Sequence, residues 1–123
     1  MQPAIKIVGG IISGLATGLT IKSSFTPDKI TITNRCGVKI SVYVQKTGSF
    51  ESNGAYTLAY DETENWGRNT TNGAVHILLF RHDTNQYLWM ELMPPAALIL
   101  NSDLLDEPEW AQDIIFPSGM FTL

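Results

Sequence analysis

The hydrophobic and polar positions change their period along the chain. Residues 7–21 carry no charge and lie between Lys6 and Lys22. From residue 28 onward apolar and polar residues alternate, most clearly over residues 38–45, and this alternation is the pattern of a half-buried strand. The change predicts two parts, an N-terminal segment over residues 1–26 and a strand-rich domain over residues 27–123.

The second part is predicted to consist of short strands separated by turn residues. Asn34-Arg35-Cys36-Gly37 and Asn72-Gly73 are turn sequences, and residues 82–85 are predicted to join two strands, 74–81 and 86–93, into a hairpin. Both of these strands carry apolar residues on each face, so we expect them to lie centrally or to be covered by another element. The spacing of strands and turns predicts an all-β fold, a two-layer β-sandwich.

The apolar N-terminal segment is predicted to precede the sandwich as a glycine-rich helix over residues 4–21. Such a helix would be about 27 Å long, close to the bilayer's hydrocarbon thickness of about 30 Å. Gly10, Gly14 and Gly18 repeat every fourth residue and would share one face, where small residues let helices pack closely in lipid. The residues predicted to insert into the membrane are Ile5, Ile7, Val8, Ile11, Ile12, Leu15 and Leu19.

Two other interpretations of this segment remain open. It is a core helix of the soluble fold, although each glycine costs such a helix about 1 kcal/mol relative to alanine. Alternatively it is a secretory signal peptide, but the sequence shows no convincing cleavable signal. We favour a segment that converts a soluble protein to a membrane-bound one, and the sequence does not decide whether that protein is secreted or cytoplasmic.

Composition and charge exclude several classes of function. The net charge is −4 and the sequence pI is near 4.9, which argues against a nucleic-acid-binding protein. A single cysteine, Cys36, excludes an intramolecular disulfide framework and a zinc site built from several thiolates.

Signals of enzymatic chemistry are weak. His76 falls within an apolar strand and His82 at a turn, and the chain has no nucleophile elbow, phosphate loop or metal-binding helix motif. The carboxylates near residues 61–64 and 103–109 do not match a calcium-loop spacing. We therefore expect no enzyme activity, no cofactor and no metal site.

Aromatic residues are the better candidates for binding. Trp66 and Arg68 follow an acidic turn, and Tyr87 and Trp89 share one strand face. Exposed tryptophan and tyrosine suit membrane interfaces, lipid headgroups and sugar rings. The alternative is that most of these side chains are buried within the sandwich.

The order of these features resembles the actinoporin-like pore-forming proteins, whose wider superfamily includes the fungal fruit-body lectins. The resemblance extends over about residues 4–100 and rests on the glycine-rich start, the Asn34-x-x-Gly37 turn, the Thr71-x-Gly-Ala-Val75 strand start and Met93-Pro94. It implies a sandwich that binds a membrane, oligomerises and inserts its N-terminal helix, with Pro94 beside a headgroup site. The aromatic run that follows this proline in the family is replaced by Ala96-Ala97-Leu98-Ile99-Leu100.

The sequence thus predicts a membrane-permeabilising protein whose partners are a lipid bilayer, further copies of itself and a lipid headgroup or glycan. The alternative is a lectin-like module that binds a carbohydrate or headgroup and whose helix is structural or oligomerising.

Overall fold

The fold is all-β and has two sheets. The computed structural model describes residues 5–8, 11–13, 18–21, 28–45, 52–68 and 73–112, and it describes side chains at 18–20, 28–45, 56–68 and 73–112. One sheet has the strand order β2-β1-β9-β8-β5-β6 and the other β3-β10-β4-β7. The strands are β1 (Ile5–Val8), β2 (Ile11–Ser13), β3 (Leu19–Ile21), β4 (Lys29–Arg35), β5 (Ile40–Gln45), β6 (Ser52–Leu58), β7 (Thr63–Gly67), β8 (Val75–Arg81), β9 (Gln86–Leu92) and β10 (Ala96–Asn101).

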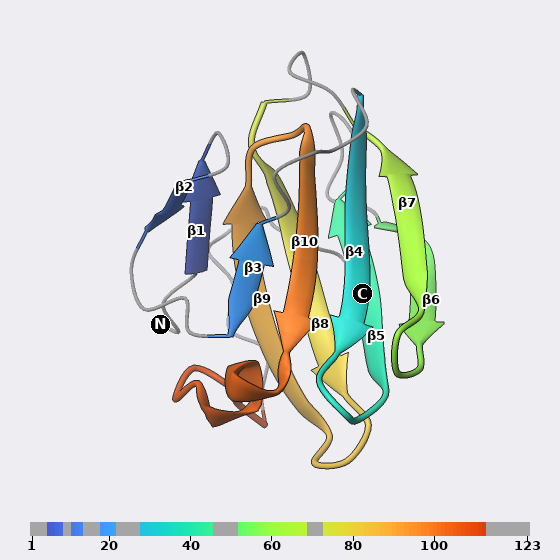
Figure 1. Cartoon of the computed structure of the whole chain (residues 1–123), viewed down its shortest axis with the longest axis vertical. Coiled ribbons are helices and arrows are strands. Elements are labelled where there is room, and N and C mark those ends of the chain that lie inside the picture. The colour runs from blue at the N-terminus through green and yellow to red at the C-terminus, as the bar shows by residue number, and fades with distance from the viewer. Residues whose placement is uncertain are drawn as a thin grey trace.

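The hydrophobic core lies between the two sheets, which overlap in Figure 1. Alternate residues of each strand point into it because successive side chains of a strand face opposite sides. On β5 these are Ile40, Val42 and Val44, all without exposed surface. On β4, Ile30 and Ile32 close the core from the other sheet. The predicted all-β, two-sheet fold is thereby confirmed.

The helix predicted over residues 4–21 is not shown. The described residues of this segment form β1, β2, β3 and the turn residue Gly18, and residues 4, 9, 10 and 14–17 lie outside the described part. Two physical reasons favour strands here. Ile5, Ile7 and Val8 are β-branched and lose side-chain freedom in a helix, and Gly18 has a φ of +83°, outside the right-handed helical region.

The predicted turns place the body strands as expected. β8 and β9 form an antiparallel hairpin around residues 82–85, with Arg81 opposite Gln86. At the turn after β4, the Asn34 side chain accepts a hydrogen bond from the Cys36 amide at 2.9 Å and donates to the carbonyls of Val38 and Leu58 at 2.8 and 2.7 Å. Asn34 has no exposed surface, so this buried polar side chain has its hydrogen bonds satisfied within the fold.

The chain leaves β10 through a short 3-10 helix, η2 (Ser102–Asp106). It then returns to the other sheet, where Ala111 forms an isolated antiparallel bridge with Tyr87 of β9. We call residues 102–112 the C-terminal strap. In Figure 1 the strap lies at the lower end of the sandwich, where η2 follows β10.

Candidate functional site

The apolar N-terminal segment occupies one side of both sheets. β1 runs parallel to β9, with Ile5 opposite Met90 and Ile7 opposite Leu92, and β2 lies outside β1. β3 runs antiparallel to β10 and is one of the two edge strands of the second sheet. Figure 1 shows β1, β2 and β3 together on the left of the molecule. The remaining strands of the two sheets, β9-β8-β5-β6 and β10-β4-β7, are formed entirely by residues that follow this segment.

Among the predicted membrane-inserting residues, Ile5, Ile7 and Val8 lie in β1, Ile11 and Ile12 in β2, and Leu19 in β3. The side chain of Leu19 is buried in the core with 7% of its surface exposed. Leu15, Gly10 and Gly14 lie outside the described residues.

Gly18, the third glycine of the predicted packing row, contacts the C-terminal strap. Its carbonyl accepts a hydrogen bond from the Asn101 amide at 2.7 Å, and the Asn101 side chain donates to Thr20 Oγ1 at 2.7 Å. Gly18 packs so closely on Leu104 that a Cβ atom would overlap the Leu104 backbone. Glycine is required here both for this contact and for its positive φ.

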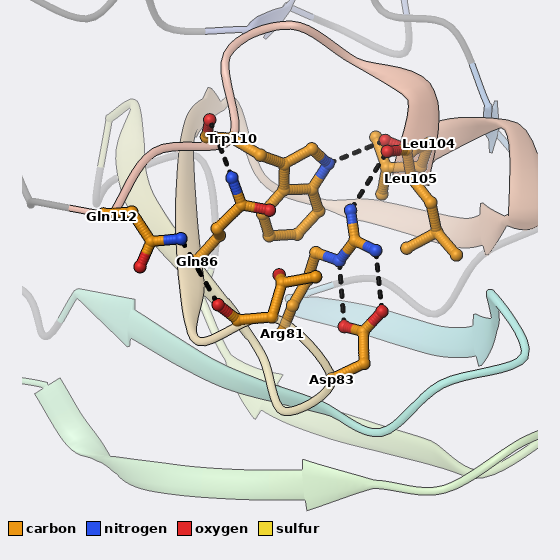
Figure 2. A network of polar contacts seen from close by, with 8 residues as sticks. Arg81, Asp83, Gln86, Leu104, Leu105, Trp110 and Gln112 are labelled. Carbon is orange, nitrogen blue, oxygen red and sulfur yellow. Dashed lines mark hydrogen bonds and ion pairs between the residues drawn. The ribbon is translucent and has the colours of Figure 1, made fainter.

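The strap is fixed to the β8–β9 hairpin by one arginine and one tryptophan (Figure 2). Arg81 lies over the Trp110 ring, 5.2 Å from its centroid, and donates to the Leu105 carbonyl at 3.0 Å. Its Nε and Nη2 atoms donate to both carboxylate oxygens of Asp83 at 3.0 and 2.7 Å. The indole Nε1 of Trp110 donates to the Leu104 carbonyl at 2.8 Å. The hydrogen bond from Arg81 lowers the pKa of Asp83.

Two carboxyl groups of the strap lie close together. Glu107 is buried with 5% of its surface exposed. The pKa of Glu109 is raised, first by burial and then by a hydrogen bond with Glu107. The sequence showed only an acidic run here, because spacing alone does not reveal which carboxylates meet.

The residues predicted to bind a headgroup or sugar are mostly buried, and they lie on different elements. Trp66 on β7 and Trp89 on β9 are 3% and 4% exposed, Pro94 is buried and Tyr87 is half-buried. Trp66 belongs to the core between the sheets, whereas Trp89 lies outside that core cluster. The structure therefore does not bring these residues together on one exposed face.

Arg68, the fifth of these residues, directly follows β7. It is 4% exposed, and its guanidinium donates to the carbonyls of Gln45 at 2.8 Å, Gly67 at 2.8 Å and Val44 at 3.4 Å. Burial lowers its pKa. A guanidinium satisfied by three backbone carbonyls serves the fold, because few of its donors remain for a ligand.

Exposed aromatic surface lies elsewhere, at Tyr56 and Tyr60, which are 43% and 65% exposed. Tyr56 is on β6 and packs edge-on against Trp66, with ring centroids 5.6 Å apart. Tyr60 lies in the turn after β6, next to the exposed Arg35–Asp61 ion pair at 2.9 Å. The sequence pattern placed these tyrosines only on or beside strands, since alternation does not show which edge stays open to water.

Histidine, serine and cysteine side chains, which are capable of acid–base or nucleophilic chemistry, lie on strands of the six-stranded sheet and in turns. His82 Nε2 and the Ser41 hydroxyl share a hydrogen bond of 2.6 Å, and Ser41 also contacts the Thr57 hydroxyl at 2.8 Å. His76 Nδ1 lies 2.8 Å from Gln45 Oε1, and burial lowers the pKa of His76. The nearby Glu91 carboxylate opposes that shift. Burial raises the pKa of Cys36 to about 11, which keeps it a thiol at neutral pH.

Among the residues that the structure describes, no group of three or more metal-ligating side chains is gathered. Nor does any helix within the described ranges have the length and apolar character needed to cross a membrane.

No protein-family model, no curated protein and no solved structure matches this chain.

Proposed function

We propose that this protein binds lipid bilayers and permeabilises them through its N-terminal segment, residues 1–26. The observation that supports this most is the place of the charge-free stretch. Its described strands are added at one side of each sheet, and the strands β9-β8-β5-β6 and β10-β4-β7 pair with one another without them. Release of the segment would break the short pairings of β1 with β9 and of β3 with β10, and its conversion to a helix would also break the pairing of β1 with β2. The pairings among β4 to β10 would remain.

Lipid would stabilise the released segment by burying its aliphatic side chains, at about 25 cal/mol per Å² of apolar surface. Within the bilayer every backbone N–H and C=O must be paired, and a single segment achieves this only as a helix. We therefore place the predicted helix over residues 4–21 in the membrane-bound state. Lys6 would lie in the headgroups or in a water-filled pore, because a charge at the bilayer centre costs about 3 kcal/mol or more.

Permeabilisation by this route requires several copies, since one helix encloses no channel. In the helical state Gly10, Gly14 and Gly18 would lie on one face and let neighbouring helices approach closely. The proposed assembly is a homo-oligomer in which these glycine faces meet.

The proposal is tested by dye release from phosphatidylcholine and mixed phosphatidylcholine–phosphatidylglycerol vesicles. Ile12→Asp places a charge in the segment, and Tyr60→Asp places the same charge on the exposed turn of the sandwich. We expect wild type and Tyr60→Asp to release dye and Ile12→Asp to lose at least about tenfold in potency, because a buried aspartate costs about 3 kcal/mol in lipid. Equal release by Ile12→Asp and wild type would contradict the proposal.

A second candidate is a lectin-like module that binds a headgroup or carbohydrate. The exposed Tyr60, which precedes Asp61 of the exposed Arg35–Asp61 ion pair, is the observation that favours it, because aromatic rings and charged hydrogen-bonding groups together suit sugars and headgroups. Under this alternative the expected effects of the two variants are exchanged. Tyr60→Asp would lose binding to phosphocholine or sugar ligands, and Ile12→Asp would keep it.

A further inference from the structure

His76 and Glu91 face each other on the outer side of the six-stranded sheet. They are directly opposed on the antiparallel ladder of β8 and β9, and opposed side chains of such a ladder share one face of the sheet. Val75 and Ile77, the neighbours of His76 on β8, belong to the core, so His76 points away from it. His76 Nε2 lies 3.9 Å from Glu91 Oε2. The pair is formed by the strand pairing, and no spacing motif in the sequence marks it.

Gln45 on β5 fixes the tautomer of the His76 ring. Gln45 Oε1 accepts a hydrogen bond from the His76 backbone N–H at 3.0 Å, so this atom is the oxygen of the amide and not its nitrogen. His76 Nδ1 lies 2.8 Å from the same oxygen. Because an amide oxygen only accepts, Nδ1 must carry the ring proton. In the neutral ring Nε2 is then left with a lone pair, on the side of Glu91.

Two electron-pair donors therefore meet at this point of the sheet. Burial lowers the pKa of His76, so its ring is neutral at pH 7. An imidazole nitrogen and a carboxylate oxygen are both ligands of divalent transition metals. The side chains of His76 and Glu91 are 18% and 30% exposed, so water reaches the pair and can complete the coordination of an ion.

The geometry of the pair suits one zinc ion. Zn–N and Zn–O bonds are about 2.0–2.2 Å long, so one ion joins two ligand atoms that lie about 3.4 Å apart at a tetrahedral angle and up to about 4.2 Å apart at wider angles. The 3.9 Å between His76 Nε2 and Glu91 Oε2 lies within this range. Histidines that bind metal almost always donate their other ring N–H to a fixed acceptor, and Gln45 Oε1 is that acceptor here. The Trp89 ring packs against the His76 ring with centroids 5.8 Å apart.

We propose that His76 and Glu91 bind a divalent transition-metal ion such as Zn²⁺, and that Gln45 positions the imidazole for it. This inference does not depend on the proposed membrane activity. Lys6 is opposite Glu91 in the pairing of β1 with β9, and a protonated lysine has no lone pair to offer a metal. The protein thus supplies two ligands and water supplies the others.

The test is isothermal titration of the full chain with zinc chloride at pH 7.5, without lipid. We expect Zn²⁺ to bind the wild type, and His76→Gln and Glu91→Gln each to weaken binding by about tenfold or more, at least the loss that an outer-shell partner typically causes. The control is His82→Gln, which removes the other histidine, a residue hydrogen-bonded to Ser41. This variant should bind Zn²⁺ as the wild type does.

A competing cation tests the class of ligand. Ca²⁺ prefers oxygen ligands, so an equal concentration of Ca²⁺ should not displace Zn²⁺. Absence of Zn²⁺ binding by the wild type up to about 1 mM, wild-type affinity in Glu91→Gln, or displacement by Ca²⁺ would overturn the proposal.

Nuclear magnetic resonance of the two histidine rings locates the ion directly. In the metal-free protein at pH 7.5, long-range ¹H–¹⁵N spectra should show His76 protonated at Nδ1. Zn²⁺ should then shift the Nε2 resonance of His76 and leave the ring of His82 unchanged. A proton on Nε2 of His76 in the metal-free protein, or shifts confined to His82, would contradict the proposed site.

Discussion

The backbone of Gly18 lies against the backbone of Leu104, so the N-terminal strand β3 and the C-terminal strap contact each other with no side chain between them. The Asn101 hydrogen bonds to Gly18 and Thr20 strengthen the same contact. The strap thereby helps to hold the N-terminal segment on the sandwich.

Replacing Gly18 by alanine is expected to weaken this contact. The added methyl group would overlap Leu104, and overpacking of this kind costs about 1–3 kcal/mol. The matched control is Gly37→Ala, because Gly37 also has a positive φ, +89°, but has open space around it. Urea unfolding should show Gly18→Ala to be clearly the less stable of the two. Equal destabilisation would mean that φ alone accounts for the effect.

The contact of Arg81 with Trp110 gives a second prediction. Arg81→Ala removes a cation–π contact and hydrogen bonds to Leu105 and Asp83, so a loss of about 1–3 kcal/mol in the free energy of unfolding is expected. Arg35→Ala is the control, since the Arg35–Asp61 pair is half exposed and such pairs contribute about 0–1 kcal/mol. Chemical denaturation of both variants measures the difference, and similar losses would contradict the role assigned to Arg81.

Glu109 and Asp83 should contribute to stability with opposite dependence on pH. The pKa of Glu109 is raised in the folded protein, so its contribution is full below the unfolded pKa and is lost as pH rises through the folded value. The pKa of Asp83 is lowered, so its contribution is present above the unfolded pKa and is lost as pH falls through the folded value.

Urea midpoints measured from pH 3 to 7 check this difference. Relative to wild type, Glu109→Gln should gain stability as pH rises across this range, and Asp83→Asn should lose it. The prediction fails if the two variants shift in the same direction with pH.

The glycine row gives a prediction about assembly. Gly14→Leu fills the middle of the face on which the proposed helices pack, so the variant should bind vesicles but form no oligomer and release no dye. Chemical crosslinking on vesicles and circular dichroism in water measure assembly and folding separately. Wild-type oligomers formed by Gly14→Leu would show that assembly does not use the glycine face.

Local signals predicted the body of the fold well. The hairpin around residues 82–85 was predictable because its turn residues and flanking apolar strands are adjacent in the sequence. The N-terminal strands were not predictable in this way, because a charge-free run of isoleucine, valine and glycine suits a helix in lipid as well as a strand near a sheet edge. Their partners, β9 and β10, lie far along the chain.

The candidate site was harder to predict for a related reason. Alternation along a strand identifies two faces but not which of them is covered, so Trp66 and Trp89 could be assigned to a core or to a surface. The contact of Arg81 with Trp110 joins a hairpin to a distant strap, and no local pattern marks it.

A reversible covalent tether between β3 and β10 would determine whether permeabilisation requires release of the N-terminal segment. Thr20 and Ile99 are opposed on these antiparallel strands, where Cα atoms lie about 4.5–5.5 Å apart, within the range of about 4.4–6.8 Å that a disulfide spans. Cys36 is buried with a pKa of about 11 and should not react. We expect the oxidised Thr20→Cys/Ile99→Cys protein to bind vesicles without releasing dye, and reduction to restore release. Full release by the oxidised protein would show that the N-terminal segment need not leave the sandwich, and would contradict the proposed function.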